Sequence, residues 1–176
     1  MRIVKYNVEL TRLTEDKIEL VRHWRNDKKI SVYMEFRDEI TPEMQIKWFH
    51  RINNENNYYF IIEFDGKEIG LINVRDIDYA LKEGEVGIFI YDDDYLNSDV
   101  SFRACLCLDD FCFETLKLER LIGHIIRDNK RSIKFGEFLG FIIEPQQENV
   151  YNQKYILLPK NYFEQREIIL KGLISC

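Results

Sequence analysis

The amino-acid sequence predicts a mixed α/β fold, in which a central sheet carries helices on both faces. Three observations lead to this prediction. Apolar residues recur at helical spacing in the first third of the chain, and from Tyr58 onward they alternate with a period of two. The segment 100–117 is apolar nearly all round, as a helix buried against a sheet is. A short apolar strand at 121–126 is then followed by a helix that Gly140 closes.

The elements are expected in the order strand, two helices, three strands, helix, strand, helix and two strands. Thr14 is placed as the N-cap of the first helix, and Thr41 with Pro42 opens the second. Asp65 and Gly66 form a hairpin turn between two strands. The expected strands are 3–10, 58–64, 67–77, 85–91, 121–126, 141–144 and 154–158, and the expected helices are 15–26, 42–52, 100–117 and 129–139.

Length and composition limit the kind of protein. A chain of 176 residues fits one domain, expected over 1–176, and its net charge of −6 gives no general attraction to nucleic acid or to anionic membranes. No apolar run has the length of a signal peptide or a membrane span, so a cytoplasmic protein is expected. The four cysteines form no metal-binding or disulfide pattern, so reduced thiols and no metal are expected.

The last third of the chain carries a local motif. Asn129 opens the helix, Ser132 follows three residues later, and the helix ends in Leu-Gly-Phe at Phe141. This motif and the order of the elements resemble the GNAT superfamily of N-acetyltransferases over nearly the whole chain. The resemblance implies that the parallel strands 85–91 and 121–126 splay apart and that acetyl-CoA inserts its pantetheine arm between them. The residues assigned to acetyl-CoA in this way are Phe89, Ile90, Asn97, Ser98, Ser101, Phe102, Arg103 and Asn129.

The loop expected to face the pyrophosphate departs from the family pattern. The segment 96–102 contains none of the glycines that the family uses there, and Asp99 adds a negative charge. At an effective dielectric constant near 20, a second negative charge about 5 Å away repels it by about 3 kcal/mol. Ser98 or Asp99 as an N-cap, or Arg103 as a compensating cation, would relieve this repulsion. A GNAT-fold binding module with weakened or lost CoA binding is therefore the alternative to an enzyme.

Proton transfer in the reaction requires a base and an acid. The resemblance places Glu85, at the head of a central strand, as the base, whereas an ordinary solvated carboxylate is the alternative. Many family members carry a tyrosine acid at the position of Gly136, so that role is open here. Tyr91 and Tyr95 are possible substitutes, each equally compatible with a structural role. His124, inside an apolar strand, is predicted to be a core or sheet-edge residue.

The N-terminal half resembles one branch of the family. Trp24-Arg25-Asn26 and the later Trp48-Phe49 are similar to N-acetyltransferases that act on nucleotide-linked 4-amino sugars and to those that act on ribosomal-protein N-termini. The resemblance implies a primary amine of a small molecule as the acceptor, with a protein N-terminus as the alternative. Core anchoring by the tryptophans, and a helix-dipole contact by the arginine, are the structural alternatives. The residues assigned to the acceptor are Arg25, Asn26 and Trp48.

A long connection without a clean period, 27–40, separates the first two helices. Its aromatic-rich part, 30–36, fits either a lid over the substrate or a surface for a homodimer. The sequence leaves both interpretations open.

Overall fold

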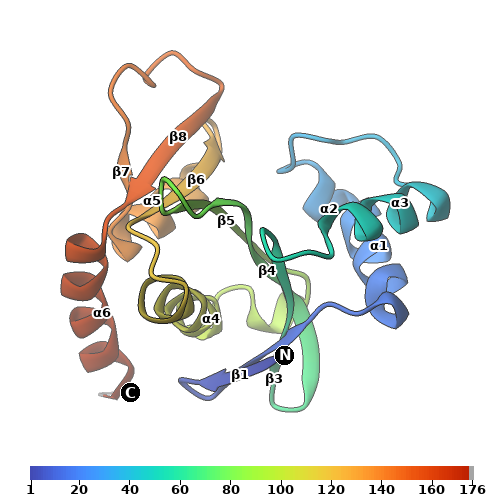
Figure 1. Ribbon diagram of the computed structural model, residues 1–176, viewed down its shortest axis with the longest axis horizontal. Coiled ribbons are helices and arrows are strands. Elements are labelled where there is room, and N and C mark those ends of the chain that lie inside the picture. Colours follow the sequence, from blue (N-terminus) through green and yellow to red (C-terminus); the bar gives the residue numbers. More distant parts are fainter. Residues whose placement is uncertain (175–176) are drawn as a thin grey trace.

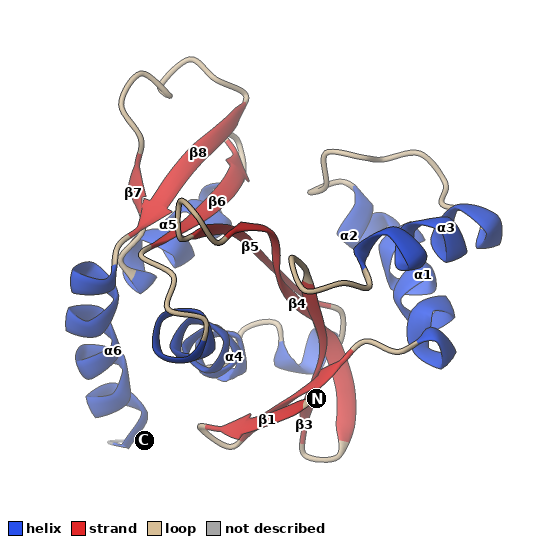
Figure 2. Ribbon diagram, viewed as in Figure 1, coloured by secondary structure: helices blue, strands red, loops and turns tan. Residues whose placement is uncertain are grey.

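The computed structural model describes residues 1–174 and contains an eight-stranded sheet in the order β1-β2-β3-β4-β5-β6-β8-β7 (Figures 1 and 2). Neighbouring strands are antiparallel except for β5 and β6, which are parallel. The strands are β1 (Arg2–Lys5), β2 (Val8–Arg12), β3 (Tyr58–Phe64), β4 (Lys67–Asp78), β5 (Glu83–Ile90), β6 (Arg120–Ile126), β7 (Ile142–Ile143) and β8 (Asn152–Leu157). The helices are α1 (Ile18–Asn26), α2 (Lys28–Ser31), α3 (Pro42–Ile52), α4 (Val100–Asp110), α5 (Lys130–Leu139) and α6 (Pro159–Ile174).

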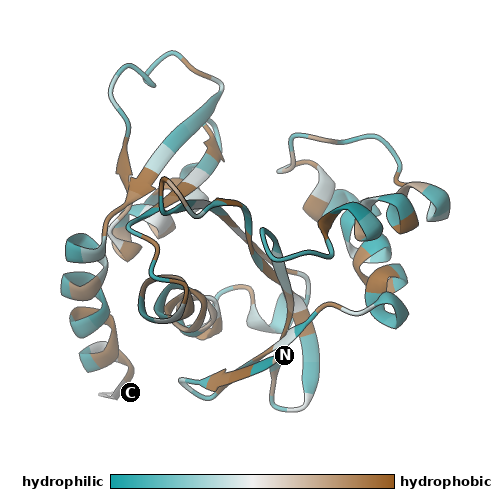
Figure 3. Ribbon diagram, viewed as in Figure 1, coloured by the Kyte–Doolittle hydropathy of each residue, from teal (hydrophilic) through white to brown (hydrophobic). Residues whose placement is uncertain are grey.

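Helices lie on both faces of this sheet, as the sequence predicts. One face of β3 and β4 packs against α1 and α3, with Trp24 and Phe49 buried in that layer. The opposite face packs against α4, with contributions from α5 and α6. Figure 1 shows these two groups of helices on opposite sides of the strands, and Figure 3 shows hydrophobic residues concentrated along α4 and the central strands. No helix within residues 1–174 is long and apolar enough to cross a membrane.

The prediction of a single first strand over 3–10 is wrong. The segment is a tight hairpin, in which β1 and β2 pair from Arg2↔Thr11 to Lys5↔Val8. Tyr6 and Asn7 form the turn with φ values of 57° and 60°. A two-residue turn with positive φ at both positions matches the twist of a hairpin, but the usual Asn-Gly signal is absent here.

Other helix and strand ends also differ from the sequence expectation. The first helix begins with a 3₁₀ turn, Glu15–Lys17, and Thr14 makes no side-chain cap hydrogen bond there. The helix predicted over 100–117 is divided in two: α4 ends at Asp110, and a π-helical turn, Phe111–Thr115, follows it directly. The sequence prediction omitted α2 and α6 altogether.

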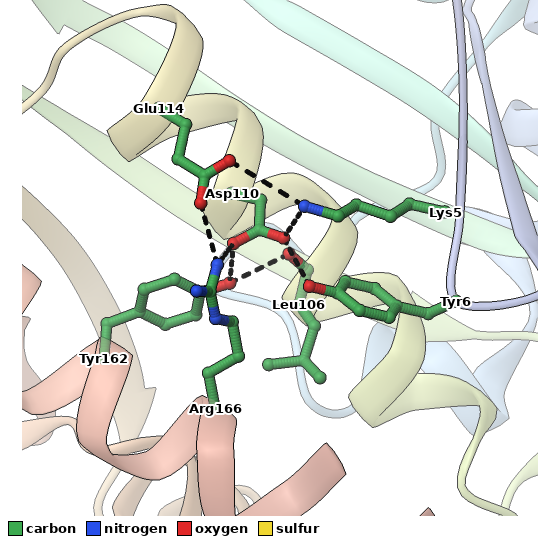
Figure 4. A network of polar contacts seen from close by, with 7 residues as sticks. All are labelled: Lys5, Tyr6, Leu106, Asp110, Glu114, Tyr162 and Arg166. Carbon is green, nitrogen blue, oxygen red and sulfur yellow. Dashed lines mark hydrogen bonds and ion pairs between the residues drawn. The ribbon is translucent and has the colours of Figure 1, made fainter.

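A polar network around Asp110 fastens α6 and the first hairpin to α4 (Figure 4). The hydroxyls of Tyr6 and Tyr162 donate to its carboxylate at 2.5 and 2.6 Å, and Arg166 Nη1 donates at 2.6 Å. Lys5 completes the set as an ion pair. Burial alone would raise the pKa of Asp110, but these four donors outweigh it and hold the pKa below its usual range. One buried carboxylate thus joins three elements that are far apart in sequence.

The neighbouring Asp109 has the opposite environment. Its side chain is buried, and within the described residues its Oδ2 atom has no hydrogen-bond partner. Burial, assisted by the charge of Asp110, raises the pKa of Asp109 well above its usual value. Three cysteines, Cys105, Cys107 and Cys112, are buried free thiols on and after the same helix, and Cys176 lies outside the described residues.

Asp109→Asn is expected to stabilise the protein at neutral pH. A raised carboxyl pKa means that the folded state binds a proton that the unfolded state releases. The free energy of unfolding therefore falls as the pH rises, by up to about 1.4 kcal/mol per pH unit between the pKa of the unfolded state and that of the folded state. Thermal unfolding should show a higher Tm for the variant near neutral pH and a difference that shrinks as the pH falls towards about 4. Asp110→Asn, as the control, should lower the Tm, and a variant at Asp109 that lowers it too would contradict this interpretation.

Candidate active site

The sheet divides between β5 and β6. These parallel strands are paired only from Glu83↔Arg120 to Val86↔Gly123. Beyond this point β5 stays with β4 as far as Ile90, and β6 stays with β8 as far as Ile126. Residues 87–90 and 124–126 therefore have no strand partner on the sides that face each other, within the described chain. The strands form a V-shaped gap whose apex lies at Val86 and Gly123, and whose exposed backbone groups can bind an extended ligand as an added strand would.

Two helices begin at the open end of this gap, because both parallel strands end there. Asn129 follows β6 and accepts a hydrogen bond from the backbone N–H of Ser132 at 3.1 Å, which caps α5. Gly140 closes the helix at a φ of 98°. The predicted capped helix is confirmed at both ends. The first turn of α4 also begins at this end and presents the free N–H groups that open any helix.

The glycine-free loop before α4 neutralises its own negative charge. Asp99 accepts from Nη2 and Nε of Arg103 at 2.7 and 3.0 Å, and Arg103 Nη1 donates to the carbonyl of Tyr6 at 3.2 Å. The hydroxyl of Ser98 accepts from the N–H of Val100 at 3.3 Å. The carboxylate is thus turned onto Arg103, and the N–H groups of the first turn at Ser101 and Phe102 remain available to an anion.

A charged triad occupies the apex of the gap. Glu85 is paired with Arg75 on β4, and His124 Nδ1 lies 3.2 Å from Glu85 Oε1. Burial would lower the pKa of Arg75, but the charge and hydrogen bond of Glu85, together with the charges of Tyr59 and Asp76, outweigh burial and raise it. The side chains of Glu85 and His124 are 21% and 33% exposed, so both are partly accessible to solvent. His124 is not a core residue, whereas the sheet-edge alternative agrees with its place at the unpaired border of β6, where its side chain contacts Glu85.

Residues 7–142 match the family model of the acetyltransferase (GNAT) domain. The chain belongs to the GNAT acetyltransferase family. It is 24% identical over 140 residues to a spermidine N(1)-acetyltransferase of Escherichia coli, and the aligned region covers 79% of this chain and 75% of that protein. It is also 24% identical over 151 residues to the acetyltransferase PseH of Campylobacter jejuni, covering 85% and 90%.

The fold also agrees with a solved structure. A spermidine N-acetyltransferase from Vibrio cholerae, in complex with CoA and spermine, superposes with a TM-score of 0.78 at 19% identity and covers 90% of this chain and 99% of that one. Family membership and the named acetyltransferase relatives make this chain an N-acetyltransferase. GNAT enzymes use acetyl-CoA. The unpaired strand edges and the free first turn of α4 are groups that an extended arm and a pyrophosphate would satisfy.

Gly136, where the family resemblance would place a tyrosine acid, packs closely against the sheet. Gly136 is buried on α5, and a Cβ atom there would lie 3.3 Å from Cδ1 of Ile125 on β6. A larger side chain at this position would force Ile125 to move. The glycine thus allows α5 to pack closely on the sheet, and the proton must be supplied from elsewhere.

The two tyrosines considered as substitutes lie away from the apex. Tyr91 stacks on Trp24 at a centroid distance of 5.5 Å, and its hydroxyl lies 3.3 Å from Asp27. Tyr95 packs against Phe64 at 5.6 Å, beside the β3–β4 turn. Both side chains contact residues on other elements.

The remaining residues assigned to acetyl-CoA take different places. Phe102 packs against Phe135 of α5 at 4.6 Å, which joins the two helices at the open end of the gap. Asn97 is exposed in the loop. Phe89 lies on the α1 side of the sheet, 6.3 Å from Trp24, while Ile90 is buried in the core on the α4 side. The side chains of Phe89 and Ile90 therefore pack within the protein, and only the backbone of these two residues borders the gap.

The three residues assigned to the acceptor lie on the α1 and α3 side. Asn26 exchanges two hydrogen bonds of 2.9 Å with the backbone of Ile40, so its amide holds the long connection in place. Trp48 packs edge-on against Tyr59 at 5.1 Å. Arg25 is partly buried, and within the described residues its Nε atom has no hydrogen-bond partner. Burial lowers its pKa, and the positive charge of Arg75 adds to this effect.

The Asp99–Arg103 pair yields a test by a double-mutant cycle. Arg103→Ala should weaken acetyl-CoA binding about tenfold or more, because the freed Asp99 charge then faces the pyrophosphate. Asp99→Asn alone should retain or improve binding, and the double variant should recover most of the loss. Calorimetric titration with acetyl-CoA measures all four proteins. Equal affinity of the wild type and Arg103→Ala would show that the loop does not contact the pyrophosphate.

Proposed function

We propose that this enzyme transfers the acetyl group of acetyl-CoA to a primary amine on a small molecule that also carries negative charge, such as a nucleotide-linked 4-amino sugar. Arg25 carries this proposal. Arg25 is partly buried, its Nε atom has no hydrogen-bond partner within the described residues, and burial lowers its pKa, so an uncompensated positive charge at this place is costly. An anionic group on the acceptor would provide that partner.

The charges around the apex support an anionic rather than a polycationic acceptor. Arg25 and Arg75 lie close enough for the charge of one to lower the pKa of the other. Two carboxylates, Glu85 and Asp76, lie at this place, and both already pair with Arg75. A polyamine would need several free carboxylates along its length, whereas a phosphate would be attracted by the unpaired guanidinium.

There is also space for the carrier of the amine. A cavity of about 460 Å³ lies beside the end of α1, between α2 and the connection to α3, and its lining includes both basic residues, Lys28 and Arg37, and acidic ones, Asp38 and Glu39. Arg37 Nη2 donates to the hydroxyl of Tyr151 at 2.9 Å and so joins this connection to the loop between β7 and β8. A volume of this size is in the range of small-molecule sites. These contacts favour the interpretation of the aromatic-rich segment 30–36 as a lid over the acceptor rather than as a homodimer surface.

The acceptor class is tested by measuring release of free thiol from acetyl-CoA with three amines. A nucleotide-linked 4-amino-4,6-dideoxy sugar should give a higher kcat/KM than spermidine or a peptide N-terminus. Preference for spermidine would contradict the anionic acceptor, and preference for the peptide would favour the protein N-terminus. Absence of acetyl-CoA binding by calorimetry would favour the binding module.

Arg25→Met should raise the KM for the nucleotide-linked sugar about 10- to 100-fold, the effect of losing one charge-assisted hydrogen bond. The kcat/KM for a neutral carrier such as n-butylamine should remain unchanged, since this acceptor has no anion. Arg51→Met, an exposed arginine on α3, is the matched control and should leave both unchanged. An equal loss for both amines in Arg25→Met would mean that the arginine supports the fold instead.

A further inference from the structure

Acetyl transfer moves one proton from the attacking nitrogen to the departing sulfur. We propose that His124 Nε2 carries this proton and that Glu85 is a positioning residue that acts through His124. The proposal rests on the acetyl transfer proposed above. It gives His124 the role of general acid, which Gly136 cannot fill. Three observations support it: the position of the histidine in the sheet, its contact with Glu85, and the places of the alternative acids.

His124 lies where the reacting carbonyl is expected. It is the first residue of β6 after the last parallel pair, Val86↔Gly123. An arm that enters from the open end, with its pyrophosphate at the start of α4, reaches inward to this apex. Because Glu85 is paired with Ile122 and side chains alternate along a strand, Glu85 and His124 are on the same face of the sheet.

The contacts of Glu85 determine which nitrogen of His124 is free. Arg75 pairs with Glu85 Oε1, the same oxygen that His124 Nδ1 approaches. Only a protonated Nδ1 is attracted to that oxygen at 3.2 Å, since two lone pairs would repel each other. We therefore assign the proton of the neutral imidazole to Nδ1, which leaves the lone pair of Nε2 available. A carboxylate that orients a histidine in this way is the arrangement found in Ser-His-Asp hydrolases.

The other candidate acids do not reach the apex. Tyr91 and Tyr95 contact α1, α2 and the β3–β4 turn. Tyr155 is paired with Gly123 but lies on the opposite face, where it is buried and its hydroxyl donates to Gln153 at 3.3 Å. His124 is thus a partly exposed side chain in contact with Glu85 that can both accept and donate a proton.

The proton balance of the step is simple. The lone pair of the amine attacks the thioester carbonyl, and a C–N bond forms. Nε2 of His124 accepts the proton that the nitrogen loses, while Glu85 stabilises the resulting imidazolium. The C–S bond then breaks with its electron pair on sulfur, and Nε2 returns the proton to form the free thiol. The histidine ends as it began, and no further reactant is required.

The test is chemical rescue by imidazole. His124→Ala should lower kcat about 100-fold or more, the usual contribution of a general acid–base group. Added imidazole should restore part of this loss, and acetyl-CoA affinity by calorimetry should stay within about threefold of the wild type, a difference below 1 kcal/mol. His124→Asn retains a polar contact with Glu85 and should lose as much kcat, which separates proton transfer from structural support. Glu85→Gln should lower kcat without rescue by imidazole.

Thiol release is measured with both n-butylamine and the nucleotide-linked amino sugar. A wild-type enzyme that uses only n-butylamine contradicts the acceptor proposal and leaves the His124 comparison intact. A kcat within about threefold of the wild type for His124→Asn or His124→Ala overturns the proposal, as does a loss that imidazole does not restore. A wild type that releases no thiol with either amine contradicts the transfer itself, and the role of His124 with it.

Discussion

The separation of β5 from β6 is the constraint on which the rest of the site depends. Backbone groups within a sheet are normally paired, and leaving several of them open has a cost that a ligand can offset. Each strand keeps its outer neighbour along its whole length, so the sheet remains intact on both sides of the gap. The same divergence places two helix N-termini at one end and Arg75, Glu85 and His124 at the other. We propose that acetyl-CoA binds along this opening and that the chemistry takes place at its apex.

Charge compensation explains how the molecule departs from its family and still fits the family's co-substrate. The loop before α4 lacks glycines, but Arg103 neutralises Asp99, and the loop keeps free N–H groups. Gly136 removes the tyrosine acid and lets α5 approach Ile125, while His124 lies on the open face of the neighbouring strand. Arg25 shows the reverse case, since its buried Nε atom has no hydrogen-bond partner within residues 1–174. Charges that are satisfied internally support the fold, and this unsatisfied one points to the acceptor.

The sequence predicts those parts of the structure that local chemistry determines. The cap at Asn129, the left-handed residue Gly140 and the turn at Asp65 and Gly66 each depend on a few adjacent residues. The first hairpin was missed because Tyr6 and Asn7 take positive φ without a glycine. The Asp99–Arg103 pair has helical i, i+4 spacing, a signal that is present in the sequence. The contact of His124 with Glu85 joins residues on two parallel strands, and only the register of those strands reveals it.

Backbone hydrogen exchange with and without acetyl-CoA tests most directly whether the gap is the binding place. Peptides covering residues 87–90 and 124–126 and the first turn of α4 should exchange more slowly when acetyl-CoA is bound, because the ligand pairs with their open N–H groups. The already paired segments 83–86 and 120–123 should change little. Protection confined to other parts of the chain, or none at saturating acetyl-CoA, would contradict the central role of this opening.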